Sequence, residues 1–300
     1  MKKCFVLFLI VLGMNAFGQN AAPEGAVNGL FSIGNGRQVY FSKGNLQYQA
    51  STNTWRFAEN QWDYVGGKLG GVTHCGNVEG SSNSGISESY SGWIDLFGWG
   101  TSGYAHGAVC YQPWSTSGNE NDYMAFGNIS NELSGQADWG YNRIVNGGNE
   151  ENQWMTLSHV SWEYLLIRRP TPSGMRYVNA RVNDVLGIAI LPDDWDVSYC
   201  ELIPSGNGVN VFSAEQWKNQ MESHGAVFLP EAGYRQGATV NSAGNSGNYA
   251  ASTINRKGGG YSKPNKVYSL SFNGKGLISV TTFGSSRADG YSVRLVHAAN

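Results

Sequence analysis

The chain has 300 residues with a formal net charge of −2, and charged residues make up only 14% of it while aromatic residues make up 13%. Low charge combined with many aromatic side chains excludes an intrinsically disordered chain. The 41 glycines, 10 tryptophans and 16 tyrosines indicate a loop-rich, β-rich fold held together by aromatic packing. About 280 residues remain once a leader is removed, which is enough for one elaborated domain or two small ones.

Residues 1–18 have the pattern of a signal peptide. Two lysines precede the apolar run Phe5–Leu12, and the small residues Ala16 and Gly18 have cleavage-site spacing, so Gln19 is the expected mature N-terminus. The alternative is a membrane anchor, but the run is shorter than the roughly 20 apolar residues that a span needs. Cys4 precedes the apolar run, which argues against a lipoprotein anchor, and no later stretch predicts a membrane span. We therefore expect an exported protein that is secreted, periplasmic or at the cell surface.

Residues 19–150 are predicted to form a β-rich N-terminal part. Short apolar runs between turn residues predict strands at Leu30–Ile33, Val39–Ser42, Leu46–Tyr48, Trp55–Phe57 and Trp62–Val65. Residues 104–149 show few regular periods and are expected to form an excursion that Trp139–Tyr141 holds to the core. An aromatic cluster is interpreted as core, because such rings bury large apolar areas, with a sugar-stacking platform as the alternative; it comprises Trp93, Leu96, Phe97 and Trp99.

The mature chain has three cysteines, Cys75, Cys110 and Cys200. Export permits a disulfide, and the odd count leaves at least one thiol free. Cys75–Cys110 is one candidate pair, and three reduced, packed cysteines are the alternative. No two of them have the spacing of a metal site.

Two helices are predicted in residues 151–300. The first covers Ser158–Arg169, with Ser158 as its N-cap, Pro170 as its end, and one apolar face made of Val160, Tyr164 and Ile167. The second covers Ser213–His224. Its Ser213 and Gln216 fit a capping box, Trp217 and Met221 share a face, and Gly225 is the expected C-cap.

Strands surround these helices. Arg176–Val182 and Leu186–Leu191 flank an Asn183–Asp184 turn, and Ala226–Leu229 is a short buried run that Pro230 ends. An Asn-Gly pair inside Lys266–Ile278 predicts a hairpin. In Tyr291–Val296, Val293 and Leu295 alternate with Ser292 and Arg294, which predicts a strand with one buried face.

Four phrases of the C-terminal half carry a resemblance: LPEAGYR (229–235), GNYAAS (247–252), SLSFNGKG (269–276) and GYSVRLV (290–296). Together they resemble C-type-lectin-like domains of the formylglycine-generating-enzyme type. They look closer still to paralogous surface proteins of gut Bacteroidales and to the Fibrobacter succinogenes major paralogous domain. Those proteins usually have Tyr-Trp-Ser-Ser where this chain has Tyr249-Ala250-Ala251-Ser252. The resemblance extends upstream through Val39–Tyr64, Ser91–Ser102 and Trp154–Trp195.

The resemblance implies an α+β, C-type-lectin-like fold that is β-rich, with two main helices and long loops. Residues 151–300 would be its core and would include a C-terminal display region. Some members of this fold are diversified by retroelements near the C-terminus. The resemblance therefore implies a non-catalytic binding protein. The candidate ligand-binding residues lie in the loops and hairpin between the buried ends of this region, where small, aromatic and cationic side chains suit an adaptable surface; they are Ala250, Ile254, Arg256, Lys257, Tyr261, Thr282, Phe283, Ser285, Arg287 and Tyr291. Tyr261, Phe283 and Tyr291 can alternatively be core residues, and the protein can alternatively be a structural or adhesive subunit of a surface assembly.

The expected ligand is a protein or a glycan. Residues 226–300 hold eight Lys/Arg and two Asp/Glu, whereas residues 19–225 hold ten and twenty. A basic display face favours an acidic ligand, although uneven charge can also arise by chance. Nucleic acid is not expected as a partner of an exported protein.

No metal, cofactor or enzymatic activity is expected. Formylglycine-generating enzymes bind copper through a late pair of cysteines, and this chain has no cysteine after Cys200. Its five histidines are scattered along the sequence, which argues against an iron site. The Asp193–Asp196 cluster could supply oxygen ligands to calcium. A turn with hydrogen-bonding aspartates is the simpler interpretation.

Overall fold

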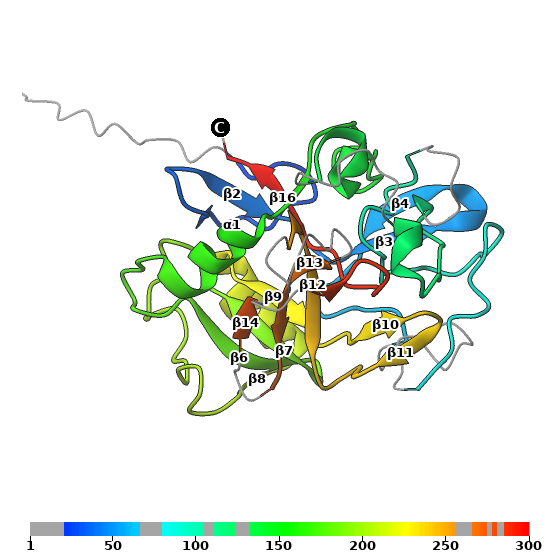
Figure 1. Ribbon diagram of the computed structural model, residues 1–300. Helices are drawn as coiled ribbons and strands as arrows, with labels where there is room; N and C mark the ends of the chain where they lie inside the picture. The colour runs from blue at the N-terminus through cyan, green and yellow to red at the C-terminus, as the bar shows by residue number, and fades with distance from the viewer. Residues whose placement is uncertain are drawn as a thin grey trace, which may run out of the picture.

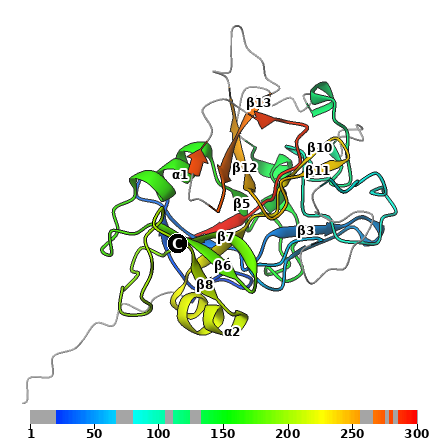
Figure 2. The same ribbon diagram turned by 90° about the horizontal axis from the view of Figure 1, so that it is seen from below.

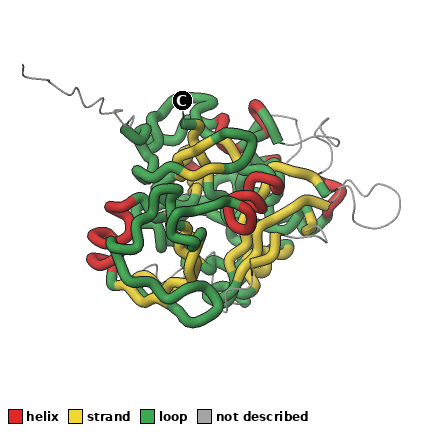
Figure 3. Tube along the Cα trace, turned by 90° about the vertical axis from the view of Figure 1, so that its left-hand side faces the viewer, coloured by secondary structure: helices red, strands yellow, loops and turns green. Residues whose placement is uncertain are grey.

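A computed structural model describes residues 21–66, 80–104, 111–123, 133–255, 266–274, 278–280 and 285–299. The described chain is β-rich α+β, with two helical segments, several small sheets and long connections (Figures 1 and 3). The predicted signal peptide, Cys75 and Cys110 lie outside the described residues. Within them, no helix has the length and apolar character needed to cross a membrane.

The two ends of the described chain meet in one sheet with the strand order β1-β2-β16-β5. Its strands are β1 (Phe31–Ser32), β2 (Gln38–Phe41), β16 (Leu295–Ala298) and β5 (Met155–Thr156). Val296 lies opposite Phe41 on one side and Met155 on the other, and Figure 1 shows β16 beside β2. The C-terminal strand is therefore central in its sheet, with a neighbour on each side.

This central position corrects the predicted strand at Tyr291–Val296. The regular strand begins only at Leu295, and Tyr291 and Ser292 make isolated bridges to Phe97 and Tyr249. Both predicted outward residues are buried, since Ser292 is 0% and Arg294 is 2% exposed. The segment has packing partners on both faces, so the alternation does not mark a solvent-facing side.

A second sheet has the order β8-β6-β7-β9. Its strands are β6 (Tyr177–Val182), β7 (Val185–Ile190), β8 (Asn210–Phe212) and β9 (Val227–Pro230). Asn183 and Asp184 form the β6–β7 turn with φ angles of 46° and 67°, the left-handed pair that a two-residue hairpin requires. The hairpin and the buried strand after the second helix are confirmed.

The first helix comprises α1 (His159–Glu163) and a wider π-type turn over Tyr164–Arg168. The Ser158 hydroxyl accepts a hydrogen bond from the Ser161 backbone N–H at 3.2 Å, as expected of an N-cap. The expected buried face is wrong, because Val160 is 62% and Ile167 is 50% exposed. The buried side chains are instead Trp162, Leu165 and Leu166. Both faces are apolar, and the face that carries the tryptophan packs inward.

The second helix comprises α2 (Ala214–Gln216), a π-type turn over Trp217–Met221 and a 3₁₀ turn over Glu222–His224. The Ser213–Gln216 capping box is present, and Gly225 ends the helix with a φ of 82°. Trp217 packs edge-on against Phe228 of β9, with ring centroids 5.5 Å apart. This contact fixes the helix on the sheet β8-β6-β7-β9. Figure 2 shows α2 close to that sheet.

The C-terminal sheet contains β12 (Gly247–Ile254), β13 (Lys266–Phe272), β14 (Ile278–Val280) and β15 (Ser285–Ser286). The strand β13 is central, pairing with β12 on one side and with β14 and β15 on the other. The antiparallel β13–β14 pairing, with Phe272 opposite Ile278, confirms the predicted hairpin.

Two hairpins complete the described strands: β3 (Leu46–Gln49) with β4 (Thr54–Phe57), and β10 (Tyr234–Gln236) with β11 (Thr239–Asn241). Besides the turn at Glu222–His224, the described part of the chain has 3₁₀ turns at Ala50–Thr52, Glu120–Tyr123, Gly135–Ala137 and Trp139–Tyr141. The predicted strand at Trp62–Val65 is wrong. The Asp63 side chain accepts from the Asn60 N–H at 3.0 Å and turns the chain there.

The aromatic cluster of the N-terminal part is core, as predicted. Leu96 and Phe97 are each 1% exposed and Trp99 is 3% exposed, while half-buried Trp93 lies under the guanidinium of Arg56. Trp139 is fully buried, and its indole N–H donates to the Thr101 carbonyl at 3.1 Å. It holds the 133–149 part of the excursion to the core, as expected.

Candidate functional site

The predicted binding residues divide into two groups. Arg256, Lys257, Tyr261, Thr282 and Phe283 lie outside the described residues. Of the other five, only Ser285 is partly exposed. Ala250 and Ile254 are each 6%, Tyr291 is 7% and Arg287 is 0% exposed. These four residues are buried and do not lie on an open face, so the prediction that they form part of an exposed binding surface is wrong.

Their burial has direct physical causes. Ala250, Ile254 and Tyr291 belong to one hydrophobic cluster, and the Tyr291 hydroxyl donates to Asp289 at 3.1 Å. The Arg287 guanidinium lies 4.3 Å from the centre of the Trp99 ring, a cation–π geometry. Burial lowers the pKa of Arg287 to about 10, so the side chain stays charged at neutral pH. It therefore acts as a fixed internal cation beneath the C-terminal sheet.

Two further arginines of the basic C-terminal region are also internal. Arg235 is 1% and Arg294 is 2% exposed. Arg294 donates to the Gln61 side chain at 2.9 Å, and Arg235 donates to the Ser115 carbonyl at 3.0 Å. Lys266 forms an ion pair with Glu120. Part of the positive charge predicted for a display face therefore belongs to buried arginines and to an ion-paired lysine, and is not free on the surface.

The topology nevertheless brings together strand ends that adjoin the two segments holding the remaining candidates. Ile254 lies opposite Val267, and Val267 lies opposite Ser285. These three residues form one row across β12, β13 and β15, roughly 10 Å wide given the usual strand spacing. The described strand β12 ends near this row, and β13 and β15 begin there.

The aspartate cluster is built for hydrogen bonding. Asp193 accepts from the Ser32 N–H at 3.0 Å, the Ser32 hydroxyl at 2.6 Å, the Gln38 amide at 2.8 Å and Arg169 at 2.7 Å. These donors lower its pKa even though burial opposes them. Asp196 accepts from the Ser198 N–H at 2.8 Å within its own turn. The hydrogen-bonding interpretation is what the structure shows, because protein donors already occupy the carboxylate that calcium would need.

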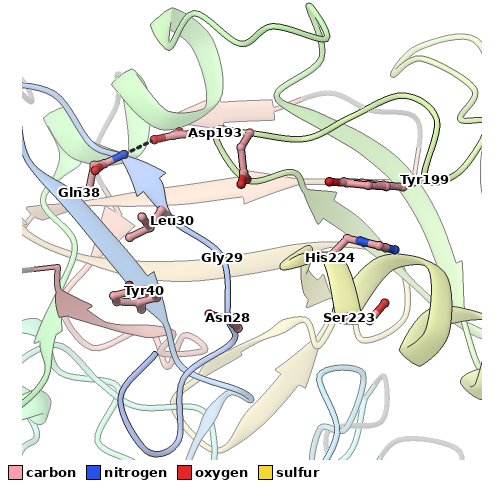
Figure 4. A pocket seen from close by; sticks show the side chains of 10 residues that line it. Asn28, Gly29, Leu30, Gln38, Tyr40, Asp193, Tyr199, Ser223 and His224 are labelled. Carbon is pink, nitrogen blue, oxygen red and sulfur yellow. Dashed lines mark hydrogen bonds between the residues drawn. The ribbon is translucent and has the colours of Figure 1, made fainter. Parts of the chain in front are cut away.

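Beside this cluster lies a cleft of about 310 Å³ that the sequence reasoning missed (Figure 4). It lies between the N-terminal segment, β2, the loop after β7 and the end of the second helix. Its lining includes Asn28, Gln38, Asp194, Tyr199 and His224. These residues come from four separate parts of the sequence. Only the Asp193–Asp196 cluster next to Tyr199 gave a signal there.

A second cavity of about 270 Å³ is bordered by β5 and the turn at residues 133–141. The buried Asp138 at its edge accepts from the Gly140 N–H at 2.9 Å, the Thr156 N–H at 2.9 Å and the Thr156 hydroxyl at 2.7 Å. Desolvation is the largest influence and raises the pKa of Asp138. With three donors engaged, Asp138 ties β5 to the turn, and it is a structural residue.

The Cys200 thiol is free and partly buried. Burial raises its pKa, which disfavours the reactive thiolate. The candidate Cys75–Cys110 pair lies outside the described residues.

Comparison with known proteins adds no assignment: no protein-family model, no curated protein and no solved structure matches the chain.

Proposed function

We propose that this chain is an exported, non-catalytic binding protein with a C-type-lectin-like scaffold, whose ligand-binding surface is formed by residues 256–265 and 281–284. The order of elements supports the scaffold, because both helices precede the β9–β16 region. That order is the one the sequence resemblance implies. Retroelement diversification of the C-terminal region belongs to the same proposal.

The observation that carries the proposal is the row Ile254–Val267–Ser285. The described strand ends next to two segments that are separate in the sequence, on β12, β13 and β15, are neighbours in this row. A ligand roughly 10 Å across could contact both of them. Arg256, Lys257, Tyr261, Thr282 and Phe283 all belong to these two segments.

The frame beneath the row is well fixed. The Asn255 N–H donates to the Lys266 carbonyl at 2.9 Å, and the Ser269 and Ser285 hydroxyls are 2.8 Å apart. Val267 is 1% and Leu270 is 0% exposed. Because these contacts do not involve the candidate side chains outside the described part, substitution of those side chains should leave the frame folded.

The proposed ligand is acidic. Residues 256–265 contain one arginine, two lysines and no acidic residue. Such a segment attracts negatively charged partners and makes binding sensitive to salt. The acidic ligand is a protein or a glycan, and the experiment below separates these two.

The test is an array of sialylated, sulfated and uronic-acid glycans with neutral counterparts, run beside a panel of extracellular proteins. The mature protein should bind acidic members of one set and lose them as salt is raised. A variant whose residues 256–265 are replaced by a Gly/Ser linker of equal length should lose this binding while keeping its melting temperature. If that variant binds as the wild type does, the segment is not the binding surface.

One observation favours the alternative function of an adhesive or structural subunit. Val160 and Ile167 are both strongly exposed on the outer face of the first helix. Exposed apolar residues that share a face can mark contact with another chain. Sedimentation of the wild type and of the Val160→Ser/Ile167→Ser variant separates the two functions. An assembly that the variant dissolves would support the subunit role.

A further inference from the structure

At the cleft beside Asp193, the N-terminal segment and the end of the second helix meet in a close contact between two glycines. A Cβ on Gly29 would lie 2.4 Å from the Gly225 carbonyl oxygen, and a Cβ on Gly225 would lie 2.7 Å from the Gly29 Cα. Only glycine allows this approach. The contact places Asn28 beside His224 at the end of the second helix, and Figure 4 shows both at the rim of the same space.

The wall opposite the helix is formed around Asp193, whose hydrogen bonds fix it and whose charge is neutralised by an arginine. Asp193 holds Gln38 and Ser32 through its carboxylate, and its backbone N–H donates to the Leu30 carbonyl at 2.9 Å. The fully buried Arg169 neutralises its charge from behind at 2.7 Å. Gln38 uses its amide N–H for Asp193, so its amide oxygen remains an acceptor at the cleft.

The other wall is aromatic. Tyr199 is 42% exposed, yet its ring is stacked on His224 with centroids 3.8 Å and planes 10° apart. The buried Trp195 meets it at 87° with centroids 5.6 Å apart. In Figure 4 the hydroxyl end of Tyr199 points into the cleft, towards the side of Leu30 and Gln38. An exposed tyrosine that is already held in place loses little entropy when it binds a ligand.

The chemistry of the lining selects the class of ligand. Asn28, Tyr199 and His224 can each donate and accept, while Asp194 and Gln38 offer acceptors. The carboxylate of Asp194 disfavours an anion. Asp193 is already neutralised, which leaves no pair of free carboxylates to hold a cation. Side chains that both donate and accept suit the hydroxyl groups of a sugar ring, which do the same.

From this geometry we propose that the cleft binds a neutral saccharide of one or two rings. The volume of about 310 Å³ lies at the small end of the roughly 300–1,000 Å³ typical of small-molecule sites. This excludes a long chain held entirely within the cleft. The site is distinct from the binding surface proposed for residues 256–265 and 281–284, and no residue of one belongs to the other.

The test uses the full mature chain with N-acetylglucosamine, methyl glucoside, methyl galactoside, cellobiose and lactose, observed by saturation-transfer NMR and calorimetry. Glucosamine and glucuronate serve as charged probes of similar size. At least one neutral sugar should bind with a Kd of about 1 mM or tighter. It should bind more tightly than either charged probe.

Tyr199→Ala should weaken that binding at least about tenfold with an unchanged melting temperature, and Tyr199→Phe should have a smaller effect. Tyr104→Ala is the matched control, because Tyr104 is similarly exposed at 37% and lies outside the cleft lining. The proposal is overturned if no neutral sugar binds at about 10 mM, if a charged probe binds best, or if Tyr199→Ala binds as the wild type does. The Arg256→Ala/Phe283→Ala variant should keep the saccharide affinity, so failure of the proposed function of residues 256–265 and 281–284 does not affect the saccharide proposal.

Discussion

Glu231 is a buried carboxylate whose side chain has no hydrogen-bond partner within the described part of the chain, and it gives the sharpest test of the structure. The residue is 1% exposed, and neither of its side-chain oxygens has a hydrogen-bond partner among the described residues. Its backbone is fixed by hydrogen bonds to Leu186 at 2.8 Å and Gly244 at 2.7 Å. The backbone that carries the side chain is therefore held in place on both sides.

Desolvation raises the pKa of Glu231 from 4.5 to about 7. Below pH 4.5 the carboxyl group is protonated in both the folded and the unfolded chain. Between pH 4.5 and about 7 the unfolded chain releases a proton that the folded chain keeps, so folding stability falls as pH rises. A shift of this size corresponds to about 3 kcal/mol lost across that window, at about 1.4 kcal/mol for each pH unit.

Glu231→Gln removes this titration. Urea unfolding of the wild type and the variant between pH 4 and pH 8 should give a difference that changes by about 3 kcal/mol in favour of the variant. The glutamine is itself buried without partners, which adds a constant offset but no slope. Glu24→Gln, at an exposed carboxylate, is the control and should follow the wild type at every pH. A Glu231→Gln difference that stays flat over this range would refute the burial of an unpaired carboxylate.

Two further substitutions test how the second helix is held. Ser213→Ala should lower the free energy of unfolding by about 1 kcal/mol, because the capping box loses its hydroxyl acceptor; urea titration measures this, and an unchanged midpoint would contradict the cap. Gly225→Ala should cost at least about 1–2 kcal/mol from the left-handed φ of 82° alone, and more from its contact with Gly29. The same substitution should weaken saccharide binding in the cleft, whereas Ser213→Ala should leave that binding unchanged.

Local signals in the sequence predicted the elements that depend on local chemistry. Asn183–Asp184 predicted the β6–β7 turn because few residues other than glycine adopt two positive φ angles in succession. Ser213, Gln216 and Gly225 predicted both ends of the second helix because capping depends on neighbours in the sequence.

Features that depend on distant partners were missed. The first helix has two apolar faces, and only the tertiary fold decides that Trp162 packs inward and Ile167 outward. Arg287 and Arg294 are interpreted as surface cations until the partners that bury them, Trp99 and Gln61, are known. The saccharide cleft could not be predicted, since its residues converge only through the contact between Gly29 and Gly225.

The most direct test of the central claim is the affinity of Arg256→Ala and Phe283→Ala, singly and combined, for the acidic ligand found on the arrays. Each substitution should weaken binding by roughly 1–3 kcal/mol, the usual cost of losing an interface anchor, and should leave the melting temperature nearly unchanged. Asn245→Ala, in the exposed turn before the opposite end of β12, should bind as the wild type does. If the two variants keep full affinity, or if they simply unfold, residues 256–265 and 281–284 do not form the binding surface.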